Sequence, residues 1–268
     1  MKDKKRKTIG LALGSGAYRG FAHIGILKSL QKHNIPLDYL SGASIGAWVA
    51  AYYAVFGNTD VLERNLIDNH KENLSLLFDL RSRGGLISGQ KFVAYLEEKL
   101  NYSSFADLQI PLQIVATDLT TADSYVFKSG SVAEAVRAST AVPLVFQAWE
   151  QNKKFLVDGG MSNPVPVNLV RQMGADIVIG VNLYNSQEFA NPLTGLTDTI
   201  TRGTLILLRN LSRASISDAD LVVEPNMSSW QKHSSLSKYF TRATAEAMIK
   251  VGEKAMDKLI PALKKLIS

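Results

Sequence analysis

The stretch Leu40-Ser41-Gly42-Ala43-Ser44-Ile45-Gly46-Ala47 joins an apolar extended run to an apolar helical run. A glycine lies two residues away from Ser44 on each side, which is the G-x-S-x-G pattern of a nucleophile elbow. In such an elbow the serine occupies strained backbone between a strand and a helix, and side chains at Gly42 and Gly46 would collide with neighbouring backbone. The helix start also favours negative charge nearby. The pattern predicts a nucleophile at Ser44, and a small-residue turn without chemistry is the alternative.

A second glycine-containing loop follows the first apolar run of the chain, residues 8–13, which predicts a buried strand. The loop Gly14-Ser15-Gly16-Ala17-Tyr18-Arg19-Gly20 then leads into a helical pattern over residues 21–30. Small residues between a strand and a helix allow backbone amides to approach an anion. The loop therefore predicts an anion-stabilising site next to the first strand.

Two chemistries use such a loop. A dinucleotide site needs G-x-G-x-x-G and an acidic residue at the end of the second strand, but here Arg19 takes the third glycine position and the strand ends at Ser44. An oxyanion hole needs only backbone amides, and those around Gly16 and Ala17 would face the Ser44 hydroxyl. The second interpretation makes the loop and the elbow one site.

Two aspartates end extended runs further along the chain. Asp158 follows the apolar run 154–157 and precedes Gly159-Gly160, so a tight turn with little bulk around it presents the carboxylate to another group. An Asp-Gly hairpin turn is the alternative. Asp118 stands among threonines and favours a structural role in a turn.

The remaining patterns alternate between strands and helices, which favours a mainly parallel, doubly wound sheet. Ser131 with Glu134 predicts a capping box for the helix over 131–139. The expected strands are 8–13, 113–118, 125–127, 154–157, 176–181 and 219–225; the expected helices are 21–30, 45–56, 61–69, 89–100, 131–139, 167–173, 197–213 and 241–267, with a loop at 81–85. We therefore predict an α/β fold, a mainly parallel central sheet sandwiched by helices in three layers. We expect a basic tail at 1–7 and one domain at 8–268, with the motifs within 8–184 and a mainly helical part at 185–268.

The composition is that of a globular protein, with 46% hydrophobic and 20% charged residues, and no apolar run reaches the roughly 20 residues needed to cross a bilayer. The absence of cysteine excludes disulfides, cysteine–zinc sites and a thiol nucleophile. It also fits a reducing compartment, so we expect a cytoplasmic protein. The charged, then apolar start resembles a signal peptide, but its apolar part is short and runs into the glycine loop.

The net charge of +6 lies at the two ends of the chain. Residues 2–7 carry five cations and one anion, residues 250–268 carry five lysines and two acids, and the remainder is nearly neutral. This distribution argues against a nucleic-acid-binding face. The basic ends are either solvated or weakly attracted to anionic lipids, which would place the protein peripherally at a membrane.

Five motifs together resemble the patatin-like phospholipase family, close to its compact bacterial members. They are the Gly14–Gly20 loop, Phe21-Ala22-His23-Ile24-Gly25, the Gly42–Gly46 elbow, Arg137-Ala138-Ser139-Thr140-Ala141-Val142-Pro143 and Asp158-Gly159-Gly160. All stand in family order within residues 8–184. The resemblance implies a Ser44–Asp158 catalytic dyad, an oxyanion loop at Ser15, Gly16 and Ala17, hydrolysis of acyl esters in lipids, and no cofactor or metal. Gly14, Arg19, Gly20, Gly42, Gly46, Gly159 and Gly160 would support the loop and the elbow.

The sequence departs from the family at Ser15 and Ala17, where glycines are common. Alanine still donates its N–H, although a positive φ at Ala17 would be strained. A Ser-His-Asp triad would place its histidine after Asp158, and only His233 meets that condition. His23 is expected to pack or to brace the loop, and Arg19 either braces the loop or contacts a lipid phosphate.

Three functions are compatible with these residues. The first is an acyl-ester hydrolase acting on phospholipids, lysophospholipids or simpler esters. The second is an acyltransferase, in which an alcohol replaces water, and the third is a non-catalytic protein that binds acyl chains. The intact serine, aspartate and loop argue against the third. The stretch 230–240 is expected to form a lid, an acyl-channel wall or a membrane-facing patch. Oligomeric state has no signal in the sequence.

Overall fold

A computed structural model describes residues 6–68, 88–143, 145–184, 195–227 and 241–268. The strands are β1 (Ile9–Leu13), β2 (Tyr39–Ala43), β3 (Leu112–Asp118), β4 (Ser124–Phe127), β5 (Trp149–Gln151), β6 (Lys154–Asp158), β7 (Ile177–Val181) and β8 (Leu221–Val223). The helices are α1 (Phe21–Lys32), α2 (Ile45–Phe56), α3 (Thr59–Glu63), α5 (Gln90–Lys99), α6 (Val132–Ser139), α7 (Val167–Gln172), α8 (Leu196–Ser215) and α10 (Arg242–Ile267), with short turns η1 (Ala17–Gly20), η2 (Arg64–Asp68), η3 (Phe105–Asp107) and η4 (Gly159–Met161).

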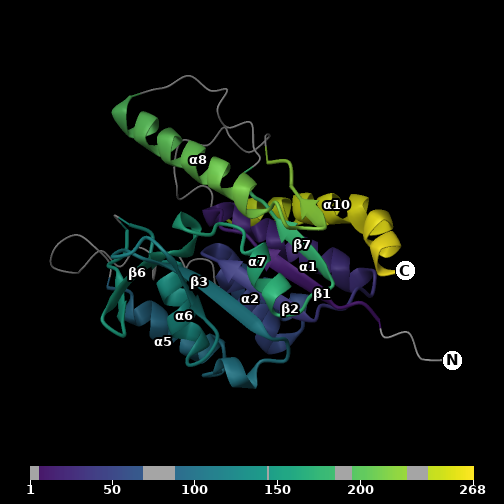
Figure 1. Ribbon diagram of the computed structural model, residues 1–268, viewed down its shortest axis with the longest axis horizontal. Coiled ribbons are helices and arrows are strands. Elements are labelled where there is room, and N and C mark those ends of the chain that lie inside the picture. The colour runs from purple at the N-terminus through teal and green to yellow at the C-terminus, as the bar shows by residue number, and fades with distance from the viewer. Residues whose placement is uncertain (1–5, 69–87, 144, 185–194, 228–240) are drawn as a thin grey trace.

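The eight strands form one sheet in the order β5-β6-β3-β2-β1-β7-β8, with β4 also paired to β3 (Figure 1). The pairs β3–β2, β2–β1, β1–β7 and β7–β8 are parallel. The pairs of β3 with β4 and β6, and of β5 with β6, are antiparallel. The predicted α/β fold is confirmed, with a parallel central sheet and an antiparallel part at one edge.

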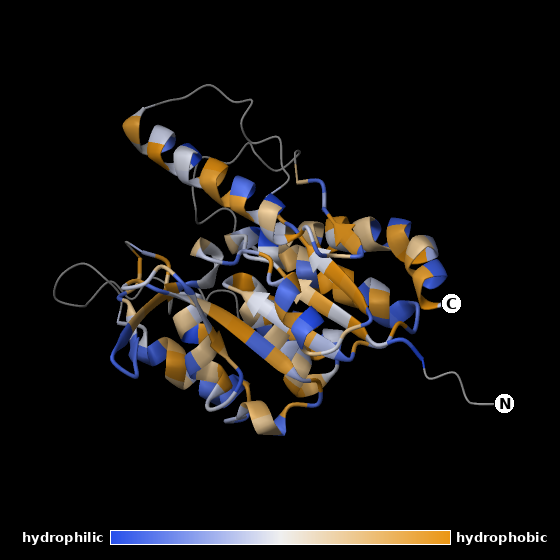
Figure 2. Ribbon diagram, in the orientation of Figure 1, coloured by the Kyte–Doolittle hydropathy of each residue, from blue (hydrophilic) through white to orange (hydrophobic). Residues whose placement is uncertain are grey.

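Helices cover both faces of this sheet because both faces of β1 are apolar. Ile9, Leu11 and Leu13 point into the main core, which α1, α2 and α10 share. Gly10 and Ala12 point to the other face, against α7. This alternation follows from the two-residue repeat of a strand. The result is the predicted three-layer arrangement, in which Figure 2 shows apolar residues concentrated on the strands and the helices beside them.

The strands β2 and β6 occupy the same edge of β3, one after the other. β2 pairs in parallel with the first half of β3, and its last residue Ala43 lies opposite Val115. β6 runs in the other direction and pairs only with the part of β3 beyond β2, where Asp158 lies opposite Ala116. β4 takes the opposite edge. The carboxyl ends of β2 and β6 therefore meet end to end, which brings Ser44 to Asp158.

One local prediction is met only in part, and others fall outside the described residues. Ser131 Oγ accepts the Glu134 N–H at 3.3 Å, so the structure records one half of the predicted capping box. The loop at 81–85, the stretch 230–240 and most of the basic tail lie outside the described residues. No helix among the described residues is long and apolar enough to cross a membrane. One domain over 8–268 stays a prediction.

Candidate active site

The turn between β2 and α2 has the geometry of a strained elbow. Ser44 has φ 55° and ψ −126°, a left-handed conformation that is costly for a residue with a side chain. A Cβ at Gly46 would lie 2.0 Å from the Leu13 carbonyl oxygen, and one at Gly42 would lie 2.5 Å from Ala47 Cα. Both expectations for the elbow are therefore confirmed: the serine is in strained backbone, and its flanking glycines leave no room for a side chain.

Ser44 and Asp158 form a short hydrogen bond at the meeting point of β2 and β6. The Ser44 hydroxyl donates to Asp158 Oδ2 at 2.5 Å, and both side chains are buried. Asp158 Oδ1 accepts the Gly160 N–H at 2.8 Å, which fixes the second carboxylate oxygen. Gly159 is packed so closely against β3 that a Cβ there would lie 2.1 Å from the Val115 carbonyl oxygen. The glycines after Asp158 thus permit the tight turn that presents its carboxylate.

The environment of Asp158 favours its protonated form. Burial raises the pKa of Asp158 from 3.8 to about 6, while the hydrogen bonds from Ser44 and Gly160 oppose that rise. At neutral pH the carboxylate is therefore mainly ionised, yet it binds a proton more readily than an exposed aspartate does. A buried acid with this pKa, next to a serine hydroxyl, has the properties of a general base.

The segment at the end of α6 contacts both residues of this pair. Ser139 Oγ accepts the N–H of Ser44 at 2.8 Å, and the Ala141 carbonyl accepts the N–H of Asp158 at 3.0 Å. The Ser139 side chain is completely buried. The sequence analysis assigns no role to Ser139, although this residue lies inside the motif 137–143. Its small polar side chain at a helix end next to a turn was the available signal.

The glycine-containing loop after β1 contacts the elbow directly. The Cβ of a residue at Gly46 would also lie 2.7 Å from the Gly14 carbonyl oxygen, and one at Gly20 would lie 2.1 Å from Ile45 Cγ1. A Cβ at Gly160 would lie 2.5 Å from Ser15 Oγ. The loop, the elbow and the Asp158 turn therefore form one compact site, as the sequence predicted.

The three amides expected to form an oxyanion hole differ in availability. The Ser15 N–H donates to the Pro164 carbonyl at 2.8 Å and is therefore not available to an oxyanion. The expectation that Ser15 contributes to the oxyanion hole is corrected accordingly. Within the described part of the chain, the N–H groups of Gly16 and Ala17 have no hydrogen-bond partner. Ala17 has φ 50°, a strained conformation for a residue with a side chain, at a position where the family commonly has glycine. Gly16 and Ala17 remain the candidate donors.

Two side chains hold this loop in place. His23 Nε2 donates to the Gly14 carbonyl at 2.7 Å, and complete burial lowers the pKa of His23 to about 4, so the ring is neutral. Arg19 is 4% exposed, and its guanidinium contacts the Gly16 carbonyl at 3.4 Å and the Tyr18 ring at 4.8 Å. The bracing role expected for His23 is confirmed, and Arg19 takes the bracing position rather than an exposed one.

Asp118 has the structural role that we expected. Its carboxylate accepts the Thr120 N–H at 2.9 Å and pairs with the ammonium group of Lys154, which lowers the pKa of Asp118. His233, the candidate for a triad, lies outside the described residues. In the described segments, no group of three or more His, Cys, Asp or Glu side chains is arranged to hold a metal ion.

Known proteins are similar to this chain in sequence and in fold. The family model for patatin-like phospholipase matches residues 11–171. An NTE family protein of Mycobacterium tuberculosis is 31% identical over 187 residues, which cover 70% of this chain and 52% of that protein. The human patatin-like phospholipase domain-containing protein 6 is 32% identical over 187 residues, covering 68% of this chain and 14% of that protein. The chain thus spans about half, or less, of the length of these relatives.

Two solved structures have the same fold at low sequence identity. VipD from Legionella pneumophila superimposes with a TM-score of 0.60 at 15% identity, covering 96% of this chain and 67% of that one. Human GIVD cytosolic phospholipase A2 gives a TM-score of 0.54 at 10% identity, covering 100% and 63%. The similarity in sequence covers the elbow, the loop and the Asp158 turn. The chain belongs to the patatin-like phospholipase family.

Proposed function

We propose that this protein is a serine hydrolase of lipid acyl esters, with Ser44 as nucleophile and Asp158 as general base. The observation that carries the proposal is the 2.5 Å hydrogen bond from the Ser44 hydroxyl to Asp158 Oδ2, at a strained elbow. In the part of the chain that is described, Asp158 is the one titratable side chain that hydrogen-bonds to Ser44. Membership of the patatin-like phospholipase family supports lipid esters as the substrate class.

The reaction follows from these contacts in two steps. Asp158 takes the proton of the Ser44 hydroxyl as Ser44 Oγ attacks the ester carbonyl, and the proton then passes to the leaving alcohol as the ester bond breaks. The product is an acyl-serine. Asp158 next accepts a proton from water, the hydroxide attacks the acyl carbon, and the proton returns to Ser44 as the free acid leaves.

The tetrahedral intermediate of each step carries a negative oxygen that needs hydrogen-bond donors. The amides of Gly16 and Ala17 are the donors that we assign, because the Ser15 amide is used by the Pro164 carbonyl. They are reinforced by the positive end of α2, which begins at Ile45. Losing one such donor typically reduces turnover by about 10²–10³-fold.

The same acyl-serine would serve an acyltransferase, in which an acceptor alcohol replaces water in the second step. A non-catalytic acyl-binding protein would have no need for a serine in strained backbone beside a carboxylate with a raised pKa. We therefore favour turnover over binding alone, with peripheral contact to a lipid surface as the setting.

The test is hydrolysis of a short and a long p-nitrophenyl acyl ester by wild type, Ser44→Ala and Asp158→Asn, with folding checked by circular dichroism. We expect turnover by wild type and near-background rates for both variants. Folded Ser44→Ala protein that matches wild type would contradict the proposal. Adding an alcohol acceptor and measuring the acylated alcohol separates transfer from hydrolysis.

A further inference from the structure

The large apolar side chains that stay exposed in the described segments gather in two places. Five of them, here called the rim, are Leu119, Val142, Val145, Phe155 and Met161; four lie on α8, namely Leu196, Ile200, Ile206 and Leu207. The remaining one is Tyr102. Exposed apolar residues scattered singly are ordinary on a protein surface, whereas clusters mark places where water is displaced by another surface.

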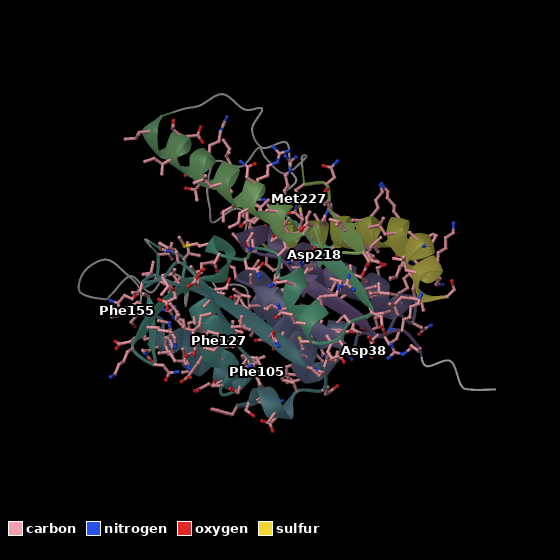
Figure 3. All side chains as sticks on the ribbon, in the orientation of Figure 1. Asp38, Phe105, Phe127, Phe155, Asp218 and Met227 are labelled. Carbon is pink, nitrogen blue, oxygen red and sulfur yellow. The ribbon has the colours of Figure 1, made fainter. Side chains whose placement is uncertain are left out.

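Two residues of the rim adjoin the turn that presents Asp158. Met161 ends η4, the turn that begins directly after Asp158. Val142 follows Ala141, whose carbonyl holds the Asp158 N–H. The other members belong to the adjoining strands and turns; Phe155 lies on β6 itself and is 50% exposed at the margin of the molecule (Figure 3). Val142 and Met161 therefore lie beside the turn that presents Asp158. Leu119, whose N–H donates to the Phe155 carbonyl, and Phe155 itself lie toward the other end of β6.

The helix α8 turns an apolar side to solvent. Leu196, Ile200 and Leu207, here called the α8 stripe, share one helical face by their spacing of four and seven residues and are 76%, 59% and 70% exposed. The less exposed side includes Ser212, which is buried, and Arg202, whose side chain is 18% exposed. A helix of a globular protein normally has the opposite orientation, with its apolar side inward.

The segment that contains α8 begins at the same edge of the sheet as the Ser44 elbow. The helix is the crossover between the parallel strands β7 and β8, so the chain leaves the sheet at the carboxyl edge, where Ser44 also lies. At that exit the Tyr184 hydroxyl accepts a hydrogen bond from Ser15 Oγ at 3.2 Å. Figure 1 shows α8 projecting from the body of the molecule, and Figure 2 shows apolar residues along it.

We propose that the rim and the α8 stripe together dock this protein onto a lipid surface, with the Ser44–Asp158 site facing the lipid. Seven of the eight side chains in the rim and the α8 stripe are aliphatic or Met, and Phe155 is the exception. Binding energy in protein–protein interfaces is concentrated in Trp, Tyr and Arg, whereas aliphatic side chains suit the acyl region of a membrane.

This inference rests on the proposed function, because it gives that function a route for its substrate. An ester in a membrane could reach Ser44 from the apolar rim without crossing bulk water. Docking would therefore raise turnover of esters in vesicles. It would not change turnover of a soluble ester, which depends only on the residues of the active site.

The experiment measures binding to sedimented vesicles of phosphatidylglycerol and phosphatidylethanolamine in equal parts. The parent protein carries Ser44→Ala, so that binding is measured without hydrolysis and does not depend on Ser44 being the nucleophile. The test variant adds Leu196→Gln, Ile200→Gln and Leu207→Gln. We expect its vesicle partitioning to fall by about tenfold or more, because three apolar side chains no longer enter the acyl region.

Two controls match the test variant. Thr204→Gln with Asn210→Gln changes exposed polar residues of the same helix, and Tyr102→Asn removes the exposed aromatic ring outside both clusters. Both are expected to bind vesicles as the parent does. With Ser44 restored, the ratio of vesicle hydrolysis to hydrolysis of p-nitrophenyl butyrate should fall for the stripe variant and not for the controls.

Three results would overturn the proposal. The first is a parent protein that does not bind these vesicles. The second is equal vesicle binding by the parent and by the folded stripe variant. The third is a parent that is dimeric by light scattering and becomes monomeric in the stripe variant with vesicle binding unchanged, which would assign the stripe to a second copy of the chain. Vesicle binding without any ester hydrolysis would contradict the proposed function and leave the docking surface intact.

Discussion

The two ends of the antiparallel pair β3–β6 carry the same residue type in opposite environments. Asp118 ends β3, pairs with Lys154, and has a lowered pKa. Asp158 ends β6, accepts hydrogen bonds from the Ser44 hydroxyl and the Gly160 amide, and has a pKa raised to about 6 by burial. One carboxylate is stabilised as an anion and the other is kept close to protonation.

This difference shows what distinguishes a catalytic acid from a structural one in this fold. Both aspartates end strands and both precede turns. The threonines beside Asp118 and the glycines after Asp158 predict different roles, and the surroundings of each carboxylate give the physical reason. A neighbouring cation makes Asp118 a poor base because its proton affinity is low. Burial beside a nucleophile makes Asp158 a better one.

The largest expected effect comes from removing the Asp158 carboxylate, with removal of the Asp118 carboxylate as the comparison. We expect Asp158→Asn to reduce kcat/KM on a soluble ester by about 10²–10⁴-fold, because an amide cannot take the Ser44 proton. Asp118→Asn, the matched control, should stay within a few fold of wild type, since its pair with Lys154 lies at the other end of β6. Equal losses in both variants, each folded by circular dichroism, would remove the functional distinction between the two.

A second prediction uses the difference in pKa. Protonated Asp158 cannot act as a base, so kcat/KM should fall about tenfold for each pH unit below about 6. The expected loss between pH 7 and pH 4 is about a hundredfold. A profile measured with a soluble ester, and with folding followed at each pH, checks this. A flat profile down to pH 4.5 would mean that a group with a lower pKa accepts the proton.

The parallel part of the sheet is easier to predict from the sequence than the antiparallel part. Strand–helix alternation and the glycines at 42 and 46 carry enough local information to predict β2, the elbow and α2, because the close contacts there exclude any side chain. The approach of Asp158 to Ser44 depends on the pairing of β6 with the part of β3 that extends beyond β2. This is a long-range contact, and no local sequence pattern predicts it. The resemblance to a family, rather than periodicity, therefore identified the partner of Ser44.

The same limit applies to smaller features of the site. The hydrogen bond from the Ser44 amide to Ser139 joins residues 95 positions apart, and the Ser15 amide is taken by a carbonyl that only the folded chain brings near. The positive φ of Ala17, by contrast, agrees with the glycine that is common at this position in the family that the sequence resembles. Local strain was predictable at these positions, and long-range hydrogen bonding was not.

A third and smaller effect is expected at Ser139, whose hydroxyl holds the elbow amide. Ser139→Ala should lower kcat by about tenfold with little change in KM, because the nucleophile loses its fixed position rather than its substrate contacts. Ser41→Ala is the matched control: Ser41 is equally buried, and its hydroxyl donates to the Pro166 carbonyl at 2.8 Å, away from the elbow amide. A similar decrease in kcat for both variants would reduce Ser139 to a packing role.

The smallest effect concerns stability and has opposite signs at the two aspartates. The folded-state pKa of Asp158 lies above the ordinary value of 3.8, so the folded protein binds the proton more tightly and loses stability as pH rises from about 4 to about 6. Above pH 6 that cost is complete, on the order of 1–3 kcal/mol. Asp158→Asn should therefore raise the free energy of unfolding at pH 8 by about this amount, and the gain should disappear near pH 4.

The pKa of Asp118 is lowered, so its carboxylate stabilises the fold at neutral pH, and Asp118→Asn should instead lower the free energy of unfolding. Urea unfolding of both variants at pH 4 and pH 8 measures the two signs. If Asp158→Asn instead lowered the free energy of unfolding at pH 8, the buried ionised carboxylate would stabilise the folded protein. That result would contradict the energetic cost that its raised pKa implies.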